Sequence, residues 1–156
     1  MTPAVQEAQS ANIPHTLHEY EHDPSAESYG LEAAEKTGTD PAKVFKTLVV
    51  CLDDDALAVA IIPVSTQLSL KRIARAAGAK KAAMAEKMAV QRSTGYVLGG
   101  VSPLGQKKRL QTFIDQSAES LDTLFVSAGR RGLEIELSPV DLAKLTGATF
   151  VLLQKD

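Results

Sequence analysis

The chain has too little cysteine for covalent cross-links or for a thiolate metal cage. Cys51 is the single cysteine among 156 residues, so an intramolecular disulfide is impossible. Because Cys51 lies within the apolar run 44–52, we interpret it as a buried structural thiol rather than as a nucleophile. A reducing compartment is the natural setting for such a chain.

Long hydrophobic runs are also absent. The segment 1–15 lacks a basic stretch followed by an apolar one, and no run approaches the ~18 apolar residues that a membrane span needs. We therefore expect a cytoplasmic protein that is neither exported nor anchored and that has no membrane partner.

Aromatic residues are few, at 4% with no tryptophan, yet the composition is that of a folded chain. Hydrophobic residues make up 44% and charged residues 23%. A chain of this length buries about 70% of its unfolded surface, which is enough for a substantial core. We therefore expect one folded domain over residues 1–156 rather than a disordered chain.

The formal net charge is only −2, but the charges are unevenly distributed. Residues 1–66 hold 3 Lys and Arg against 11 Asp and Glu, whereas residues 67–131 hold 12 against 4. Basic clusters of this kind bind phosphate groups, although solvated surface charge is the default interpretation unless they converge on one face. The candidate phosphate contacts are Lys71, Arg72, Lys80, Lys81, Arg92, Lys107, Lys108, Arg130 and Arg131.

Hydrophobic patterning and cap residues predict short helices scattered among strands. The clearest hairpins span 44–63, around an acidic turn, and 127–138, with the turn at 129–132. Further strands are expected at 16–21, 112–114, 123–129 and 149–154. The segment 94–103 is expected to form a strand that runs into a glycine-rich turn. Helices are expected at 3–12, 30–38, 69–78, 85–93 and 138–147, with a short one starting at 40. This irregular order favours an α+β domain with a mixed, curved sheet over a doubly wound parallel sheet.

Motifs for metal, nucleotide and hydrolase chemistry are incomplete. His15 and His18 are an odd number of residues apart in a strand, so they point to opposite faces, and only His18 and His22 share one. We therefore expect no metal site and no cofactor. The segment 100–107 resembles a phosphate loop but has Gln106 where the motif requires lysine, which argues against an ATPase. No nucleophile elbow of the G-x-S-x-G type is present.

Lys46 is the residue that patterning explains least. Strand alternation places it on the same side as Leu48, so an ammonium group lies on a face that otherwise looks buried. It can extend to water at the start of the strand, or it can be a cation at the mouth of a cleft that meets an anionic or carbonyl group. Gly99 and Gly100 allow a ligand to approach the backbone closely, and a proline at position 103 stiffens that turn.

Six segments together resemble one family. They are MTPAV (1–5), YEHDP (20–24), KTL (46–48), QRSTGY (91–96), GGVSPLGQKKRL (99–110) and SAGRRGLEIEL (127–137). In this combination the sequence resembles the YbaK-type bacterial aminoacyl-tRNA deacylases, free-standing relatives of the editing domain of bacterial prolyl-tRNA synthetase. The match runs in order along almost the whole chain.

The resemblance implies a mixed α/β fold around a curved, partly closed sheet, and the hydrolysis of wrongly charged aminoacyl-tRNA. It places the catalytic lysine of the family on Lys46. Glu134 stands where close relatives carry aspartate, and the resemblance assigns it no role. The substrate-binding residues that it implies are Tyr20, Tyr29, Thr47, Gly99, Gly100, Val101, Ser102, Pro103, Ser127 and Gly129.

Members that are nearest in motif act on cysteinyl-tRNA(Pro), which implies the same substrate here. A cysteine substrate carries its own thiol, which as thiolate can attack its own carbonyl and release a thiolactone, so no protein nucleophile is needed. The alternatives are an alanyl-tRNA(Pro) deacylase with a water nucleophile and a non-catalytic tRNA-binding module. The expected partners are mischarged tRNA(Pro) and, for tRNA selectivity, prolyl-tRNA synthetase in a ternary complex.

Overall fold

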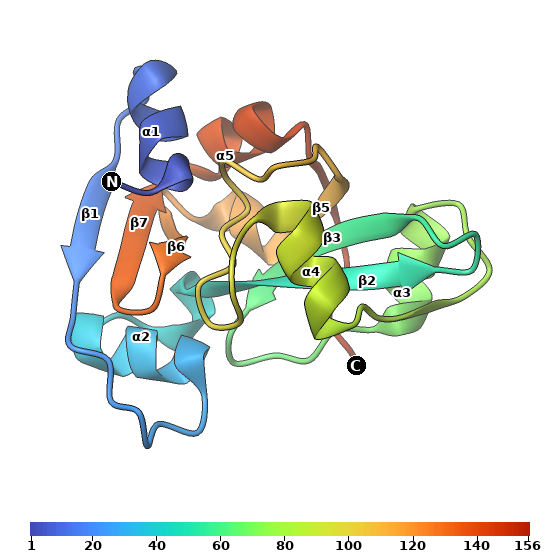
Figure 1. Cartoon of the computed structure of the whole chain (residues 1–156), viewed down its shortest axis with the longest axis horizontal. Coiled ribbons are helices and arrows are strands. Elements are labelled where there is room, and N and C mark those ends of the chain that lie inside the picture. Colours follow the sequence, from blue (N-terminus) through green and yellow to red (C-terminus); the bar gives the residue numbers. More distant parts are fainter.

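Two β-sheets form the frame of the molecule, and the computed structural model describes all residues from 1 to 156 (Figure 1). The strands are β1 (Thr16–Glu19), β2 (Phe45–Leu52), β3 (Leu57–Pro63), β4 (Ala82–Met84), β5 (Gln111–Asp115), β6 (Leu124–Arg130), β7 (Leu133–Leu137) and β8 (Thr149–Val151). The larger sheet has the order β4-β2-β3-β5-β8 and the smaller one β1-β7-β6. The larger sheet is mixed, because β2 is antiparallel to β3 and β4 while β5 is parallel to β3 and β8.

The hairpin of β2 and β3 lies at the centre of the larger sheet. Val49 and Ile61 belong to one buried cluster, whereas Val50 and Ile62 belong to another. Because both faces of the hairpin are covered, its strands are apolar almost throughout instead of alternating with polar residues. The turn between the strands places Asp55 at a φ of 66°, a left-handed conformation that Asp tolerates better than most residues.

The smaller sheet is joined to the larger one by a parallel bridge between Val44 and Phe125, and both sheets contribute to one core cluster, with Ile61 from the larger and Ile135 from the smaller. Within the smaller sheet, the pairing of β6 with β7 shifts register between Ser127 and Arg130. Such a bulge bends the strand and increases its local twist. The end of β6 therefore departs from regular pairing near the start of β2.

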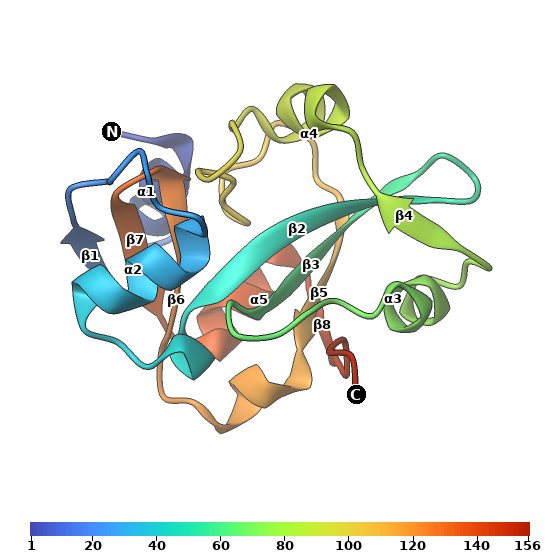
Figure 2. The same cartoon turned by 90° about the horizontal axis from the view of Figure 1, so that it is seen from below.

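Side-chain caps define where four of the five α-helices begin, and α4 (Lys87–Thr94) begins without one. The helices are α1 (Pro3–Ser10), α2 (Tyr29–Thr37), α3 (Leu70–Ala76), α4 (Lys87–Thr94) and α5 (Pro139–Thr146), with 3-10 helices η1 (Pro41–Lys43) and η2 (Gln116–Ser120). At Thr2, Ser28, Ser69 and Ser138, the hydroxyl accepts a hydrogen bond from the backbone N–H three residues further on. Helices α3 and α4 lie on opposite sides of the β2–β3 hairpin (Figure 2). None of the helices has the length and hydrophobicity of a membrane-spanning segment.

The α+β class and the mixed pairing are confirmed, but the strands divide between two sheets and do not close into a barrel. The strand predicted within 94–103 is absent, whereas the glycine-rich turn predicted in the same segment is present. After α4 the chain turns through Gly95 and Gly99, which both have a φ of +84°, a conformation that glycine adopts freely. No sequence pattern predicts β4, because its alanines lack the branched or aromatic side chains that favour strands.

Asp115 ties the end of β5 to two other segments. Its side chain is fully buried, and its carboxylate accepts hydrogen bonds from the Leu153 N–H and the Gln154 amide, both at 2.8 Å, and from the Ser117 N–H at 3.1 Å. Burial acts to raise the pKa of Asp115, but these hydrogen bonds outweigh it and leave the pKa below its usual value. Asp115 therefore fixes both η2 and the chain beyond β8.

We predict that Asp115→Ala lowers the free energy of unfolding by roughly 3 kcal/mol, because it leaves buried donors without an acceptor. Since the folded pKa of Asp115 is depressed, its contribution is complete above the unfolded pKa and is lost as the pH falls through the folded pKa. Urea unfolding at pH 7 and at pH 3 measures both effects. The exposed Asp122→Ala is the control, and equal stability of the two variants at pH 7 would contradict the prediction.

Candidate active site

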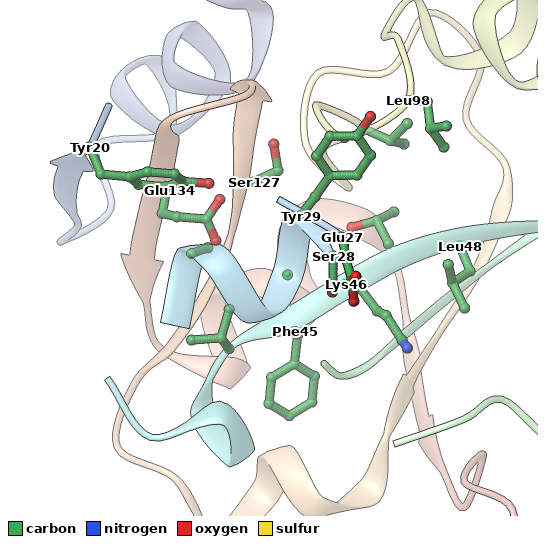
Figure 3. Close-up of a pocket in the computed structure, with 16 residues that line it drawn as sticks. Tyr20, Glu27, Ser28, Tyr29, Phe45, Lys46, Leu48, Leu98, Ser127 and Glu134 are labelled. Atoms are coloured by element: carbon green, nitrogen blue, oxygen red, sulfur yellow. The ribbon is translucent and has the colours of Figure 1, made fainter. Parts of the chain in front are cut away.

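A cavity of about 270 Å³ opens between α2, the start of β2, the loop after α4 and the β6–β7 hairpin (Figure 3). Half of its lining residues are hydrophobic. The lining residues are Tyr20, Glu27, Ser28, Tyr29, Gly30, Ala33, Val44, Phe45, Lys46, Thr47, Leu48, Leu98, Gly99, Val101, Ser127 and Glu134. This volume is at the small end of ligand sites, which suits a small polar group rather than a large ligand.

The edge of β2 that faces away from β3 has an unpaired stretch at this cavity, between the Val44–Phe125 bridge to β6 and the pairing with β4. β2 pairs with β3 along its length but with β4 only over its last three residues. The Val49 carbonyl accepts a hydrogen bond of 3.0 Å from Ala85, on the side away from β3. Since backbone groups alternate in direction along an antiparallel strand, the N–H and C=O of Thr47 point to the same side as those of Val49. No strand covers them there, so they are available to a ligand.

The side chain of Thr47 is also unpartnered. Its hydroxyl oxygen is buried and has no hydrogen-bond partner within the protein. Ser117 has the one other buried side-chain oxygen without a partner, and it lies outside the cavity. An unpaired buried polar group costs ~1–3 kcal/mol, so one in a cavity wall marks a place where a ligand would restore a hydrogen bond.

Lys46 extends from the same stretch of β2, and its ammonium group forms no ion pair. Burial lowers the pKa of Lys46 below its usual value. Figure 3 shows the ammonium group at the opposite end of the labelled side chains from Tyr20 and Glu134. A cation without a carboxylate partner is free to pair with a negatively charged group of a ligand.

Glu134, on β7, is the acidic group of the opposite wall. Only 6% of the residue is exposed, and its carboxyl makes no ion pair within the protein. Burial raises the pKa of Glu134 to about 8, so the carboxyl is mainly protonated at pH 7. Beside it, burial raises the pKa of Tyr20 to about 12, with smaller contributions from the carboxylates of Glu134 and Glu32. This wall therefore presents neutral O–H groups near pH 7.

A buried ion-pair network holds the segment that carries both cavity tyrosines. The Glu32 carboxylate is hydrogen-bonded to His22 Nδ1 and to the Asp23 N–H, both at 2.7 Å, and it pairs with Lys36 at 3.3 Å. Burial acts to raise the pKa of Glu32, but these bonds outweigh it and leave the pKa below its usual value. The network holds the chain between β1 and α2 in place, and so it fixes Tyr20 at the start and Tyr29 at the end of that segment.

The glycine pair of the loop after α4 is enclosed by the chain itself. A Cβ atom on Gly99 would lie 2.8 Å from Arg131 Nε and 2.9 Å from the Tyr29 ring. A Cβ atom on Gly100 would lie 2.8 Å from the Arg130 Cα atom. The β6–β7 turn thus occupies the space beside Gly100, and glycine is required there by packing within the protein.

Seven of the predicted catalytic and substrate-binding residues line the cavity, namely Tyr20, Tyr29, Lys46, Thr47, Gly99, Val101 and Ser127. The remaining four, Gly100, Ser102, Pro103 and Gly129, do not.

Those four residues shape the loop and the turn behind the cavity wall. Ser102 is fully buried, and its Oγ accepts a hydrogen bond from the backbone N–H two residues further on. Pro103 lines a separate, smaller cavity. Gly129 has a φ of +109° and lies against Tyr96 and Thr2, so a side chain there would displace both.

The sequence signals for the other lining residues are weaker. The alternation of Glu134, Ile135 and Glu136 predicts two glutamates on a solvent-facing side of β7. The partly exposed Glu136 is consistent with this prediction. Glu134 is not, because it is buried and faces the cavity instead of bulk water. Leu98 lines the cavity from a loop whose path depends on distant contacts, and no local pattern predicts its position.

The candidate phosphate contacts lie at separate places in the fold. Around α3, Lys71, Arg72 and Lys80 line two adjacent hollows, although Arg72 also pairs with Asp156 at 2.7 Å. The exposed Lys81 follows Lys80, just before β4. Arg92 is on the surface of α4. The backbone N–H groups of Lys107 and Lys108 donate hydrogen bonds to carbonyl groups at the end of that helix. Arg130 and Arg131 belong to the β6–β7 turn, beside the glycine pair.

The histidines and the cysteine lie outside the cavity. His15 bonds to the Ile13 carbonyl, His18 to Glu136 and His22 to Glu32, so each imidazole has its own partner. No group of three or more His, Cys, Asp or Glu side chains is arranged to hold a metal ion. Cys51 is partly exposed instead of fully buried.

The fold and its cavity can be compared with those of known proteins, and the comparison identifies the class of the protein as an aminoacyl-tRNA editing domain. The model of that family, described as "Aminoacyl-tRNA editing domain", matches residues 23–145, and the chain belongs to it. The chain is 36% identical over 152 residues to EbsC of Enterococcus faecalis, covering 96% of this chain and 90% of EbsC. EbsC is named, provisionally, as a Cys-tRNA(Pro)/Cys-tRNA(Cys) deacylase. The protein is accordingly an aminoacyl-tRNA deacylase.

Other similarities extend over most or all of the chain. The uncharacterized protein YwhH of Bacillus subtilis is 27% identical over 115 residues, which cover 74% of this chain and 73% of YwhH. A crystal structure described provisionally as a trans-editing enzyme for prolyl tRNA synthetase has a TM-score of 0.81 at 21% identity, covering 100% of this chain and 99% of its own. Hypothetical protein APE2540 has a TM-score of 0.86 at 22% identity, covering 99% and 100%. These structures share the fold.

We predict that Glu134→Gln makes the protein more stable relative to wild type as the pH rises from 5 to 8. The raised pKa means that the unfolded chain releases a proton in this range while the folded protein retains it, so the Glu134 contribution is complete below the unfolded pKa and is lost as the pH rises through about 8. The difference in unfolding free energy should grow by up to about 1.4 kcal/mol per pH unit. Urea unfolding at several pH values measures it.

The matched control is Glu136→Gln on the same strand. Hydrogen bonds from Thr123 and then His18 hold the pKa of Glu136 below its usual value, so this contribution is lost only in acid. A stability difference between Glu134→Gln and wild type that stays constant from pH 5 to 8 would show that Glu134 is not a protonated buried acid.

Proposed function

We propose that the enzyme clears cysteinyl-tRNA(Pro), and that the thiol of the substrate attacks its own ester. The observation that carries the proposal is that the cavity contains no histidine and no cysteine. Its two serines make local hydrogen bonds, because Ser28 Oγ accepts from the Leu31 N–H and Ser127 Oγ accepts from the Gly129 N–H. The cavity thus lacks a Ser–His or Cys–His pair that could act as an activated nucleophile, and the nucleophile comes from elsewhere.

The names of the relatives support this choice of substrate. EbsC is named for Cys-tRNA(Pro) and Cys-tRNA(Cys), and one structural relative is named as a trans-editing enzyme for prolyl tRNA synthetase. We therefore propose tRNA(Pro) as the tRNA partner and prolyl-tRNA synthetase as the protein that presents it, which implies a cytoplasmic setting.

In the proposed reaction the thiolate sulfur forms a bond to the carbonyl carbon, and the ester bond from that carbon to the ribose oxygen breaks. The thiol proton passes to the ribose oxygen, which leaves as the hydroxyl group of free tRNA. The other product is a cysteine thiolactone, which water then hydrolyses to cysteine. Oriented intramolecular attack of this kind contributes ~7–11 kcal/mol, so the protein has mainly to position the ester.

The open edge of β2 is suited to that positioning. The Thr47 N–H and hydroxyl donate hydrogen bonds to the aminoacyl group, and the Thr47 carbonyl accepts one from the substrate ammonium. Lys46 pairs with the terminal phosphate or with the polarised carbonyl. At the far wall, the neutral Glu134 carboxyl avoids the repulsion that a carboxylate would exert on a developing thiolate.

Hydrolysis of alanyl-tRNA(Pro) by a water molecule is the alternative reaction for the same cavity. Half of the cavity lining is hydrophobic, and a methyl group fits such a surface as well as a thiol does. The two reactions differ in whether the substrate supplies the nucleophile.

We predict that cysteinyl-tRNA(Pro) is deacylated at least tenfold faster than alanyl-tRNA(Pro) or prolyl-tRNA(Pro). Deacylation of the three substrates by purified enzyme, with and without prolyl-tRNA synthetase, measures the difference. Seryl-tRNA(Pro) is the matched control, because a hydroxyl replaces the thiol at nearly the same volume and is a far weaker nucleophile. Equal rates for the cysteinyl and seryl substrates would contradict attack by the substrate thiol.

We predict that Lys46→Ala lowers kcat by about 10²- to 10³-fold while the protein stays folded, because such losses follow removal of one electrostatic contact to the reacting group. Single-turnover deacylation measures the change, and circular dichroism checks the fold. The control is Lys43→Ala, which removes an exposed lysine three residues earlier in the chain. Wild-type turnover by a folded Lys46→Ala variant would exclude Lys46 from the reaction.

A further inference from the structure

Arg131 is bound to the wall of the cavity although it does not line the cavity itself. Its Nε and Nη2 atoms donate hydrogen bonds to the Leu98 carbonyl, at 3.0 and 2.8 Å. Its guanidinium carbon lies 4.8 Å from the centre of the Tyr29 ring, in cation–π contact. Leu98 and Tyr29 both belong to the lining, so one side chain connects two walls that come from different parts of the chain.

The backbone between these contacts fits closely against the same turn. Gly99 has no room for a Cβ atom, because Arg131 Nε and the Tyr29 ring would lie within 2.9 Å of it. Gly100 lies against the backbone of Arg130 and is buried. The loop therefore rests on the β6–β7 turn through backbone packing and is fastened to it by the guanidinium group of Arg131.

Arg130 and Arg131 are adjacent in sequence but differ in what they contact. The Arg130 side chain is 52% exposed and has one long contact, of 3.4 Å, to the exposed Glu19. Arg131 uses two N–H donors and one face of its planar group within the protein. A bidentate contact combined with stacking requires the shape of arginine, and a lysine side chain does not reproduce it.

We propose that Arg131 is a positioning residue that fastens the Gly99 loop and Tyr29 as the wall of the substrate cavity, rather than a contact to tRNA phosphate. This inference rests on the proposed function only where deacylation is the readout, because the closed loop is itself measurable. Arg130, by contrast, has a largely exposed side chain whose one contact is to Glu19, so Arg130 is the residue of the two that suits a phosphate contact.

The test compares Arg131→Lys, Arg131→Ala and the matched control Arg130→Ala. If Arg131 positions the wall, both Arg131 variants lower kcat at saturating substrate by about tenfold, and lysine does not rescue. The salt dependence of tRNA binding stays that of wild type in both variants. A phosphate contact has the opposite signature: Arg131→Lys retains activity, and Arg131→Ala lowers the salt slope by ~0.7–0.9. Either of these last results would overturn the proposal.

A second measurement reports on the loop without catalysis. The Gly100 N–H donates a 2.9 Å hydrogen bond to the Val97 carbonyl, within the loop that Arg131 fastens. Hydrogen exchange at Gly100, followed by NMR, should be several-fold faster in both Arg131 variants and unchanged in Arg130→Ala. Unchanged exchange in Arg131→Ala would overturn the proposal. If the wild-type protein deacylates none of the substrates tested, the proposed function fails, while the exchange result still decides the role of Arg131.

Gly99→Ala disturbs the contact between Arg131 and the loop by changing the loop instead of the arginine. Its Cβ atom would enter the space of Arg131 Nε and the Tyr29 ring, so this variant should match Arg131→Ala in both kcat and Gly100 exchange. Wild-type exchange and wild-type turnover in Gly99→Ala would show that the loop is held by other contacts.

Discussion

The pairing of β2 with β3 along its length, and with β4 over its last three residues only, determines the site. The continuous pairing with β3 and the burial of both faces of the hairpin together make β2 rigid. The partial pairing leaves the backbone of Thr47 open on one side. A catalytic site benefits from both properties at once, since precise geometry comes from a sheet strand while free hydrogen-bonding groups normally occur only at sheet edges.

The sequence predicts this rigid part well. Apolar runs with an acidic turn identify the hairpin, and alternation marks Lys46 as a charged residue on an otherwise buried face. Four of the helices are equally predictable, because Thr2, Ser28, Ser69 and Ser138 cap them through contacts only three residues apart. In each case the decisive interaction is local, or it is periodic along one strand.

The rest of the site depends on contacts that no local pattern encodes. Arg131 and Leu98 are 33 residues apart, and their contact decides the path of a loop that patterning predicts as a strand. Glu134 follows the normal alternation of a solvent-facing strand, and only the packing of other elements around it converts that position into a buried one. A motif thus identifies Gly99 and Gly100 as important, but it does not say whether a ligand or the protein itself fills the space beside them.

The open edge of β2 has a consequence for solubility as well as for binding. An unpaired strand edge is a template on which a second chain can add a strand, and proteins oppose this with lysine side chains and covering loops. Lys46 lies on the uncovered stretch, and Leu98 and Gly99 bring a loop to the same cavity. The charge and the loop that we assign to substrate handling therefore also oppose edge-to-edge association between copies of the protein.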